Sequence, residues 1–394
     1  MKNTTTQKTI QFAGYSTIII FFIALLEVFS YSTLHFVPQL SRFIYKAPNF
    51  QKADFNRYMA ERDPELGWPS KTWLQTFTDE GGWRRSPASD ALPQQGPCIS
   101  LYGDSMTFSD EVEDQFAWGN VMAERLGCRV ANYGVSGYGT DQAQLRFERH
   151  VAQGRELGEV IVMGVLPANL NRTVNQWRYF LVTSNPFGFK PVFSMEGDRA
   201  ILVPVFSGDF EQFRSLERNP QEYLAHDAYV PGSDNFLAPI DTPSFPYSWS
   251  LFKLMKKLIT NFRFSQIGEK SNFLNYPVYF DDRDGMSKRK VQVFEHIVDR
   301  FRSTCEEQSK RCILLLIPDA ELVLQRQRSG QHSLEWLAES IPPTLEYIDA
   351  TDIYDKVEHY CSVLSNPDIC YGHFDPEGYR LLADFVLQKM ENSP

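Results

Sequence analysis

The sequence predicts an α/β fold, a three-layer α/β/α sandwich on a mainly parallel sheet of about five strands. Apolar, β-branched segments alternate with amphipathic helical segments through residues 96–170, and two further strands and a closing helix follow residue 310. Strands that alternate with helices of this length pair in parallel through right-handed crossovers. The composition agrees with this class, since 43% of the 394 residues are hydrophobic and 22% are charged.

The charge of the chain limits its possible partners. Its net charge of -10 at pH 7 argues against a general nucleic-acid binder, because such proteins need basic side chains to neutralise phosphates. No set of metal-ligand residues and no glycine loop that cradles phosphate stands out. We therefore expect neither a metal nor another cofactor.

The N-terminal segment predicts a membrane anchor over residues 1–40. Eighteen uncharged residues separate Lys8 from Glu27, and a spanning helix needs about 20 mostly apolar residues. We place the membrane contact at residues 10–37, and a cleavable signal peptide is the alternative. Lys2 and Lys8 favour a cytoplasmic N-terminal end.

The six cysteines form three neighbouring pairs, which are Cys98 with Cys128, Cys305 with Cys312, and Cys361 with Cys370. Cys98 and Cys128 each begin a predicted strand, so adjacent parallel strands would place them side by side. An even count with local pairing indicates disulfides in an oxidising compartment; six separate buried thiols are the alternative. Together with the anchor, disulfides predict a periplasmic or extracellular body.

We expect residues 41–95 to connect the anchor to a single domain, 96–394. The first half of this domain reads as strand, helix, strand, helix and strand, in the segments "CISLY", "DQFAWGNVMAERLG", "CRVANYGV", "TDQAQLRFERHVAQ" and "EVIVMGVL". An insertion at about 171–285 then interrupts the alternation and includes a predicted two-stranded ribbon, "KPVFSMEGDRAILVPV". We interpret it as a cover for the edge of the sheet.

The second half completes the predicted sheet. A charged amphipathic helix at 288–310 precedes the buried strand "RCILLLIPD" and the strand in "LEYIDATDIYD". The closing helix begins at Asp375 and Pro376, a pair typical of a helix N-cap followed by a first-turn proline.

A serine follows the first strand directly, in Gly103-Asp104-Ser105. These residues suit a turn, but they also suit a nucleophile at the carboxyl edge of a parallel sheet, where open α/β folds bind ligands. A serine hydroxyl needs a base to become a nucleophile. Among the seven histidines, His373 lies between the last predicted strand and the closing helix, and therefore at the same edge.

Four segments occur in order in matching strand and loop contexts: "GDSM" at 103–106, "NYGVSGYGTDQ" at 132–142, "MGVLPANLNR" at 163–172 and "GHFDPEGYRLLA" at 372–383. They resemble the four sequence blocks of the SGNH, or GDSL-type, hydrolases. The resemblance covers about residues 97–172 and 312–390. It implies a flavodoxin-like sheet and a serine esterase or acyltransferase activity.

The resemblance also implies roles for individual residues. Ser105 would be the nucleophile and His373 the base. The backbone of Ser105, Gly137 and the Asn169 side chain would form the oxyanion hole, in which fixed N–H donors stabilise the charge that acyl transfer develops. Gly134 and Gly139 compete with Gly137 by sequence alone, and a loop residue is the alternative for Asn169.

One departure from the family pattern concerns the acid that orients the histidine. The family has an aspartate two or three residues before it, where this chain has Tyr371 and Cys370. Asp368 stands five residues before His373, and a disulfide at Cys370 would reshape the loop so that Asp368 reaches the ring. A backbone carbonyl as orienter, or a decayed site, are the alternatives.

We predict an acyl ester hydrolase or O-acyltransferase that acts on an envelope glycan through an acyl-Ser105 intermediate. Similar family members are tied to cell-envelope polysaccharides, which favours a glycan substrate. Arg172 follows the third segment, and we expect it to contact an anionic or sugar substrate; a solvated start to the insertion is the alternative. A lipid esterase and a non-catalytic glycan-binding or assembly subunit remain alternative functions.

Overall fold

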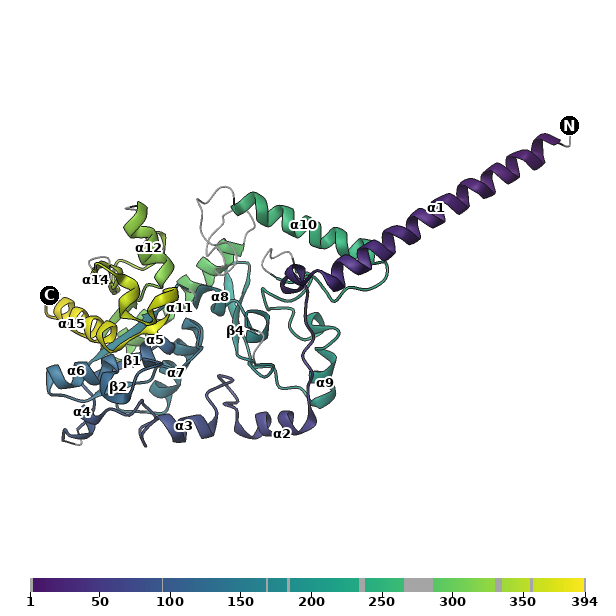
Figure 1. Cartoon of the computed structure of the whole chain (residues 1–394). Coiled ribbons are helices and arrows are strands. Elements are labelled where there is room, and N and C mark those ends of the chain that lie inside the picture. The colour runs from purple at the N-terminus through teal and green to yellow at the C-terminus, as the bar shows by residue number, and fades with distance from the viewer. Residues whose placement is uncertain are drawn as a thin grey trace. The chain divides into compact units, whose positions relative to one another are not determined.

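The computed structural model describes residues 3–93, 95–167, 169–182, 185–233, 238–265, 286–329, 335–354 and 357–392. They fall into two compact units. Figure 1 shows the whole chain, coloured by residue number from the N-terminus to the C-terminus. The smaller unit comprises Met1–Phe50 and Gly208–Val278, and the larger comprises Gln51–Ser207 and Tyr279–Pro394.

These units divide the chain differently from the predicted anchor, connector and domain. Most of the expected connector, from Gln51 onward, belongs to the same unit as the sheet. The middle of the expected insertion, from Gly208, belongs to the unit that contains the N-terminal helix. The end of the insertion, 266–285, lies outside the described residues.

The larger unit is built on the predicted parallel sheet, with five strands in the order β2-β1-β3-β6-β7. The chain winds in one direction from β1 to β2 and in the other from β3 onward, so the order reverses between β1 and β3. Ligands bind at such reversal points in open α/β sheets, beyond the carboxyl ends of the strands. The strands are β1 Ile99–Tyr102, β2 Val130–Asn132, β3 Val160–Val165, β6 Arg311–Leu316 and β7 Glu346–Asp349.

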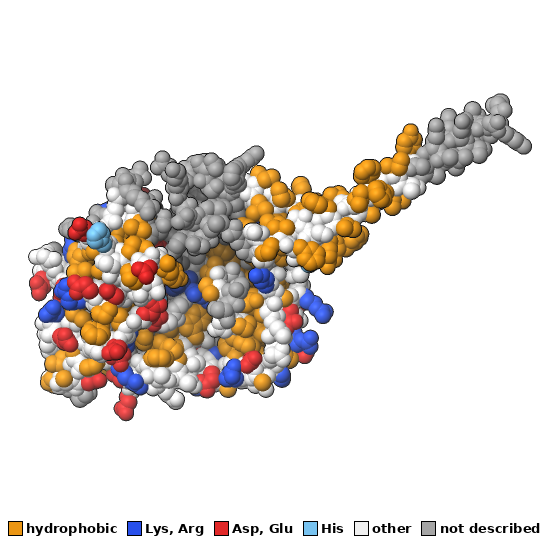
Figure 2. Space-filling view, in the orientation of Figure 1, with side chains coloured by type: hydrophobic (Ala, Val, Ile, Leu, Met, Phe, Trp, Pro, Cys, Tyr) orange, Lys and Arg blue, Asp and Glu red, His pale blue; other side chains and the backbone are white. Residues whose placement is uncertain are grey.

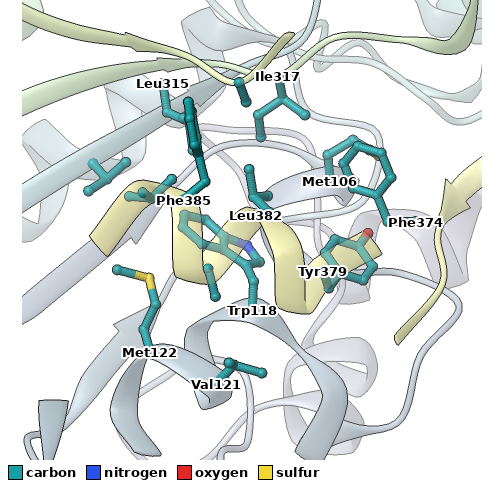
Figure 3. Close-up of a cluster of buried hydrophobic side chains, with 14 of the residues drawn as sticks. Met106, Trp118, Val121, Met122, Leu315, Ile317, Phe374, Tyr379, Leu382 and Phe385 are labelled. Atoms are coloured by element: carbon teal, nitrogen blue, oxygen red, sulfur yellow. The ribbon is translucent and has the colours of Figure 1, made fainter. Parts of the chain in front are cut away.

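Helices pack on both faces of the sheet because its strands are apolar on both sides. Leu101 packs in one core cluster with Trp118 and Leu382, while the next residue, Tyr102, packs in the other with Phe147. Figure 3 shows the first cluster, into which helices α6 and α15 project their side chains. The covering helices are α6 Trp118–Leu126 and α15 Pro376–Asn392 on this face, and α7 Thr140–Ala152 and α11 Met286–Glu307 on the other.

Shorter elements complete the larger unit. The predicted ribbon is present as the antiparallel pair β4 and β5. A second antiparallel pair, β8 and β9, precedes α15. The bounds are α2 Lys52–Glu61, α3 Lys71–Phe77, α4 Pro87–Asp90, α5 Ser105–Phe108, α8 Asn169–Thr173, β4 Val192–Glu196, β5 Arg199–Val203, α12 Ala320–Ser329, α13 Glu335–Glu339, α14 Thr351–Tyr354, β8 Leu364–Asn366 and β9 Tyr371–Phe374.

The three predicted disulfides are all present, as Cys98–Cys128, Cys305–Cys312 and Cys361–Cys370. The first joins the starts of β1 and β2, which are adjacent and parallel as expected. The third joins Cys361, in the turn before β8, to Cys370, the residue before β9. No cysteine is left unpaired within the described residues.

The smaller unit contains α1 Asn3–Phe36, α9 Phe210–Ser215 and α10 Tyr247–Ser265. Within the described residues one helical stretch, Tyr15–Phe36, is long and apolar enough to cross a membrane, and Figure 2 shows hydrophobic side chains along it. Glu27, inside this stretch, accepts hydrogen bonds from the Tyr247 and Ser248 N–H groups. The carboxylate therefore caps the first turn of α10.

A buried ion pair fixes the start of the ribbon to α7. Lys190 donates to the Asp141 carboxylate, and both side chains are completely buried. The Lys190 ammonium also donates to the Pro191 carbonyl at 2.9 Å. Breaking a buried pair leaves an uncompensated charge in a low-dielectric interior, which is strongly destabilising.

We therefore expect Lys190→Met to lower the free energy of unfolding by about 3–5 kcal/mol, measured by urea unfolding of the full chain in detergent. Lys310→Met is the matched control, because the Lys310 partner, Glu159, is 82% exposed, and we expect a loss of about 1 kcal/mol or less. Equal losses in the two variants would contradict the structural importance of the Lys190–Asp141 pair.

Candidate active site

Ser105 is the first residue of α5, directly after the carboxyl end of β1. Asp104 caps this short helix, since its carboxylate accepts a hydrogen bond of 2.9 Å from the Met106 N–H. The Ser105 side chain is largely buried, and its hydroxyl donates to no other residue in the described part of the chain. The serine is therefore held at the edge of the sheet with its hydroxyl unpaired.

His373 lies on β9, not in a loop as the sequence suggested. Helix α5 contacts β9, and Figure 3 shows Met106 of α5 beside Phe374 of β9 in the same apolar cluster. Ser105 precedes Met106, and His373 precedes Phe374. This packing brings the segments that carry the hydroxyl and the imidazole, far apart in sequence, to one edge of the sheet.

The carboxylate beside the imidazole belongs to Glu111. Its Oε1 lies 3.2 Å from Nδ1 of His373, and its Oε2 accepts from the His373 N–H at 3.4 Å and from the Ser365 hydroxyl. The Nδ1–Oε1 approach is within hydrogen-bond distance but is poorly aligned. Glu111 thus holds both the ring and the backbone of His373.

Gly372 allows this close approach. Its φ of +108° suits glycine, and a Cβ there would lie 2.1 Å from the Ser365 Oγ and 3.2 Å from the Glu111 Oε2. A larger residue would therefore push the glutamate away from His373.

The structure does not bring Asp368, the expected orienting acid, to the ring. Its side chain is exposed in a single 3-10 turn, Pro367–Ile369, and makes no contact with His373 among the described residues. The family pattern places the orienting acid just before the histidine, whereas Glu111 follows Ser105 by six residues. The acid-rich stretch "SDEVED", next to Ser105, was the available signal.

Two neighbouring acids of this loop ionise differently. Burial opposes ionisation of Glu111, but hydrogen bonds from Ser365 and His373 outweigh it and lower the pKa of Glu111. Burial raises the pKa of Asp110, although Ser136 donates to its carboxylate at 2.7 Å. Glu111 is therefore the acid better suited to remain a carboxylate beside the imidazole.

Arg84, a residue of the expected connector, clamps the loop that carries Glu111. Its buried guanidinium donates to the carbonyls of Phe108, Ser109 and Val112, and it pairs with Asp114 at 3.3 Å. These acceptors flank Glu111 on both sides. Arg84 is therefore a positioning residue, and no sequence pattern links it to this loop.

The expected oxyanion donors are unpaired. Within the described residues, neither the Ser105 N–H nor the Gly137 N–H donates a hydrogen bond, and the buried Nδ2 of Asn169 has no partner. Gly137 has a φ of +80°, which favours glycine at this turn. Buried donors without partners are costly, and they are typical of sites that bind a ligand or a developing charge.

Arg172 fixes the orientation of this amide. Its Nη1 donates to Oδ1 of Asn169 at 3.0 Å, to the Tyr138 carbonyl at 2.9 Å and to Oδ2 of Asp104 at 3.3 Å. With Oδ1 occupied, Nδ2 remains the free donor. Its Nη1 thereby joins the loops that follow β1, β2 and β3. The expected contact of Arg172 with the substrate stays a prediction.

Comparison with known proteins gives similar solved structures but no sequence match. No family model and no curated protein matches the chain. It is similar to the structure of a putative lipolytic protein of the G-D-S-L family from Desulfitobacterium hafniense DCB-2, with 11% identity and a TM-score of 0.31 over 73% of this chain and 96% of that one. It is also similar to a member of the lipolytic protein G-D-S-L family from Veillonella parvula DSM 2008, with 10% identity and a TM-score of 0.32 over 75% and 98%. The proposals below rest on the geometry of the site.

The Glu111 contacts predict a pH-dependent stability. Because the pKa of Glu111 is lowered on folding, its contribution is fully present above its ordinary value of 4.5 and is lost as the pH falls through the folded-state pKa. We expect Glu111→Gln to lower the thermal midpoint of the full chain at pH 7 and to lower it less at pH 3. Asp368→Asn, which removes no hydrogen bond to His373, should leave the midpoint at pH 7 nearly unchanged, and equal losses in the two variants at pH 7 would contradict the assignment.

Proposed function

We propose that the chain is a serine-dependent acyl ester hydrolase or O-acyltransferase. The observation that carries this proposal is the set of unpaired N–H donors of Ser105, Gly137 and Asn169 beside an unpaired serine hydroxyl. His373 lies on β9, which packs against the serine helix, and its glutamate lies in the loop that follows this helix. This arrangement supplies a nucleophile, a base with an orienting acid, and donors for an oxyanion.

The reaction follows from these groups. The Ser105 Oγ attacks the acyl carbonyl carbon while Nε2 of His373 accepts its proton, and the free N–H donors stabilise the oxyanion, at about 3–4 kcal/mol each. The intermediate then expels the alcohol, which His373 protonates, and leaves an acyl-Ser105. Water or a sugar hydroxyl, deprotonated by His373, attacks the acyl group and releases Ser105. The hydrogen bond between Ser105 and His373 forms when the substrate is bound, as catalytic contacts often tighten in that state.

The missing aspartate before His373 was the feature that favoured a non-catalytic subunit. Glu111 supplies an acid in its place. Its carboxylate lies within hydrogen-bond distance of Nδ1. It would hold the tautomer in which Nε2 accepts the serine proton and would stabilise the imidazolium that forms. We therefore favour an enzyme over a binding module, and an O-acyl group on an envelope glycan as its substrate.

We also propose that α1 is a retained anchor and that the larger unit lies outside the cytoplasm, in the periplasm or extracellular space. The exposed side chains of Tyr15–Phe36 are mostly apolar, and three disulfides stabilise the larger unit. Helix α10, capped by Glu27, exposes large apolar side chains, Trp249, Phe252, Met255 and Ile259, as helices at membrane interfaces do. Cleavage of a signal peptide near Ser30 would remove this cap.

The intact mass of the protein purified from membranes tests this anchor. We expect a mass that includes residues 1–37, with the three disulfides formed, and extraction only by detergent. A mature chain that begins near residue 30 and is soluble without detergent would contradict the proposal.

Substitutions test the chemistry. With an aryl acetate as substrate, we expect Ser105→Ala and His373→Ala each to lower kcat by at least about 100-fold, and Asn169→Ala to lower it by about 100- to 1,000-fold. Glu111→Gln should lower kcat by roughly 100-fold, while Asp368→Asn should leave it unchanged. Fatty-acyl esters compared with acetyl esters separate a lipid esterase from an enzyme for small acyl groups.

A serine-directed phosphonate supplies the control that does not depend on the substrate. We expect it to label the wild type and not Ser105→Ala. Equal labelling of the two folded proteins, or no labelling of either, would favour the binding module.

A further inference from the structure

A cavity of about 670 Å³ adjoins the candidate active site within the larger unit. Helices α2 and α3 form one wall, and the second family-like segment, through Val135, Ser136 and Gly137, forms another. Five residues that follow α8 complete it: Arg178, Val182, Asn185, Phe187 and Gly188. Its volume lies in the range of small-molecule binding sites, and Gly137 is common to the cavity and the expected oxyanion hole.

The lining of this cavity is aromatic and polar, not aliphatic. Trp68, Trp73, Tyr58 and Phe187 line it together with carboxylates, hydroxyls and amides, and the aliphatic lining is limited to two valines and a proline. The Trp68 indole is fixed, because its Nε1 donates to the Ser136 carbonyl at 3.0 Å. Such a lining suits a sugar ring, which has an apolar face and hydroxyl edges, better than a fatty-acyl chain.

Arg62 and Arg178 both line this cavity and form no ion pair among the described residues. Arg62 lies over the Tyr58 ring, so the cation next to Gly137 is Arg178. Its Nη1 donates to the Gly137 carbonyl at 3.0 Å, and a Cβ built on Gly137 would lie 3.9 Å from both its Nη2 and the Trp68 ring. Arg178 pairs with no carboxylate among the described residues. By contrast, Arg57, on the same cavity, is exposed and paired with Asp54 at 2.7 Å.

The environment of Arg178 is unfavourable for an isolated charge. Burial, followed by repulsion from Arg172, lowers the pKa of Arg178 to about 9 and outweighs the attraction of Asp104, with which Arg178 forms no ion pair. A desolvated guanidinium without a counter-ion is costly, whereas one that pairs with an anion makes strong charge-assisted hydrogen bonds. The missing counter-ion therefore indicates an anionic group on the ligand.

We propose that this cavity binds an anionic sugar unit of the glycan, with its carboxylate or phosphate on Arg178 and its ring against Trp68. The proposal rests on the function proposed above and specifies its substrate. The position of Gly137 places the bound sugar next to the oxyanion hole, so that a hydroxyl or O-acyl group of the same or the adjoining unit reaches Ser105.

Calorimetric titration of the full-length Ser105→Ala protein in detergent tests the proposal, with methyl glucuronide, glucose 6-phosphate, methyl glucoside and inorganic phosphate as probes. We expect at least one anionic sugar to bind about tenfold or more tightly than methyl glucoside. Whichever of the two anionic sugars binds more tightly shows whether the cavity prefers a carboxylate or a phosphate. Equal binding of neutral and anionic sugars, no binding of either, or binding of inorganic phosphate as tight as that of the sugars would overturn the proposal.

Variants made in the Ser105→Ala protein test whether Arg178 is the residue that binds the anionic group. Arg178→Gln should abolish the preference for the anionic sugar, Arg178→Lys should retain part of it, and Arg57→Gln should change it less than about threefold, as expected for an exposed ion pair. Trp68→Leu should weaken neutral and anionic sugars alike. Circular dichroism establishes that each variant is folded, and a preference that survives in folded Arg178→Gln contradicts the assignment.

The test separates this inference from the proposed function. It needs no turnover, so loss of the anionic preference leaves the esterase proposal intact. Failure of the wild type to hydrolyse aryl acetates would instead overturn the proposed function while the binding result stands.

Discussion

The contact between Glu111 and His373 is the constraint on which the proposed site depends. It joins the loop after β1 to the strand before α15, and so fixes the imidazole to the segment that carries Ser105. The same loop is held from its other side by Arg84. A base oriented in this way accepts the serine proton only if both attachments persist, because a small misplacement of reacting groups costs large factors in rate.

A second set of contacts, separate from those of Glu111, organises the N–H donors of the proposed oxyanion hole. Arg172 joins Asp104, Tyr138 and Asn169, which follow different strands of the sheet. These strands, β1, β2 and β3, meet where the strand order reverses, so their carboxyl ends converge. The fold therefore brings the donors together, and Arg172 leaves the Asn169 amide free to meet an oxyanion.

Local patterns were sufficient to predict the five strands of the parallel sheet, the β4–β5 ribbon, the disulfide pairs and the short segments that carry Ser105 and His373, but not the strands β8 and β9. Glu111 was missed because its approach to His373 needs a turn with positive φ at Ser109 and Glu111 and the β8–β9 pairing, which are set by tertiary structure. Arg84 and the two-unit division depend on contacts between segments far apart in the chain. Periodicity and spacing carry no information about such contacts.

The orientation of the imidazole is the claim that can be tested most directly. In protein carrying ¹⁵N-labelled histidine, with Ser105 modified by a phosphonate, we expect a downfield proton resonance from the Nδ1–H group of His373. The resonance should persist in Asp368→Asn and disappear in Glu111→Gln. If the resonance survives in Glu111→Gln, or if Asp368→Asn removes it, Glu111 is not the residue that orients His373.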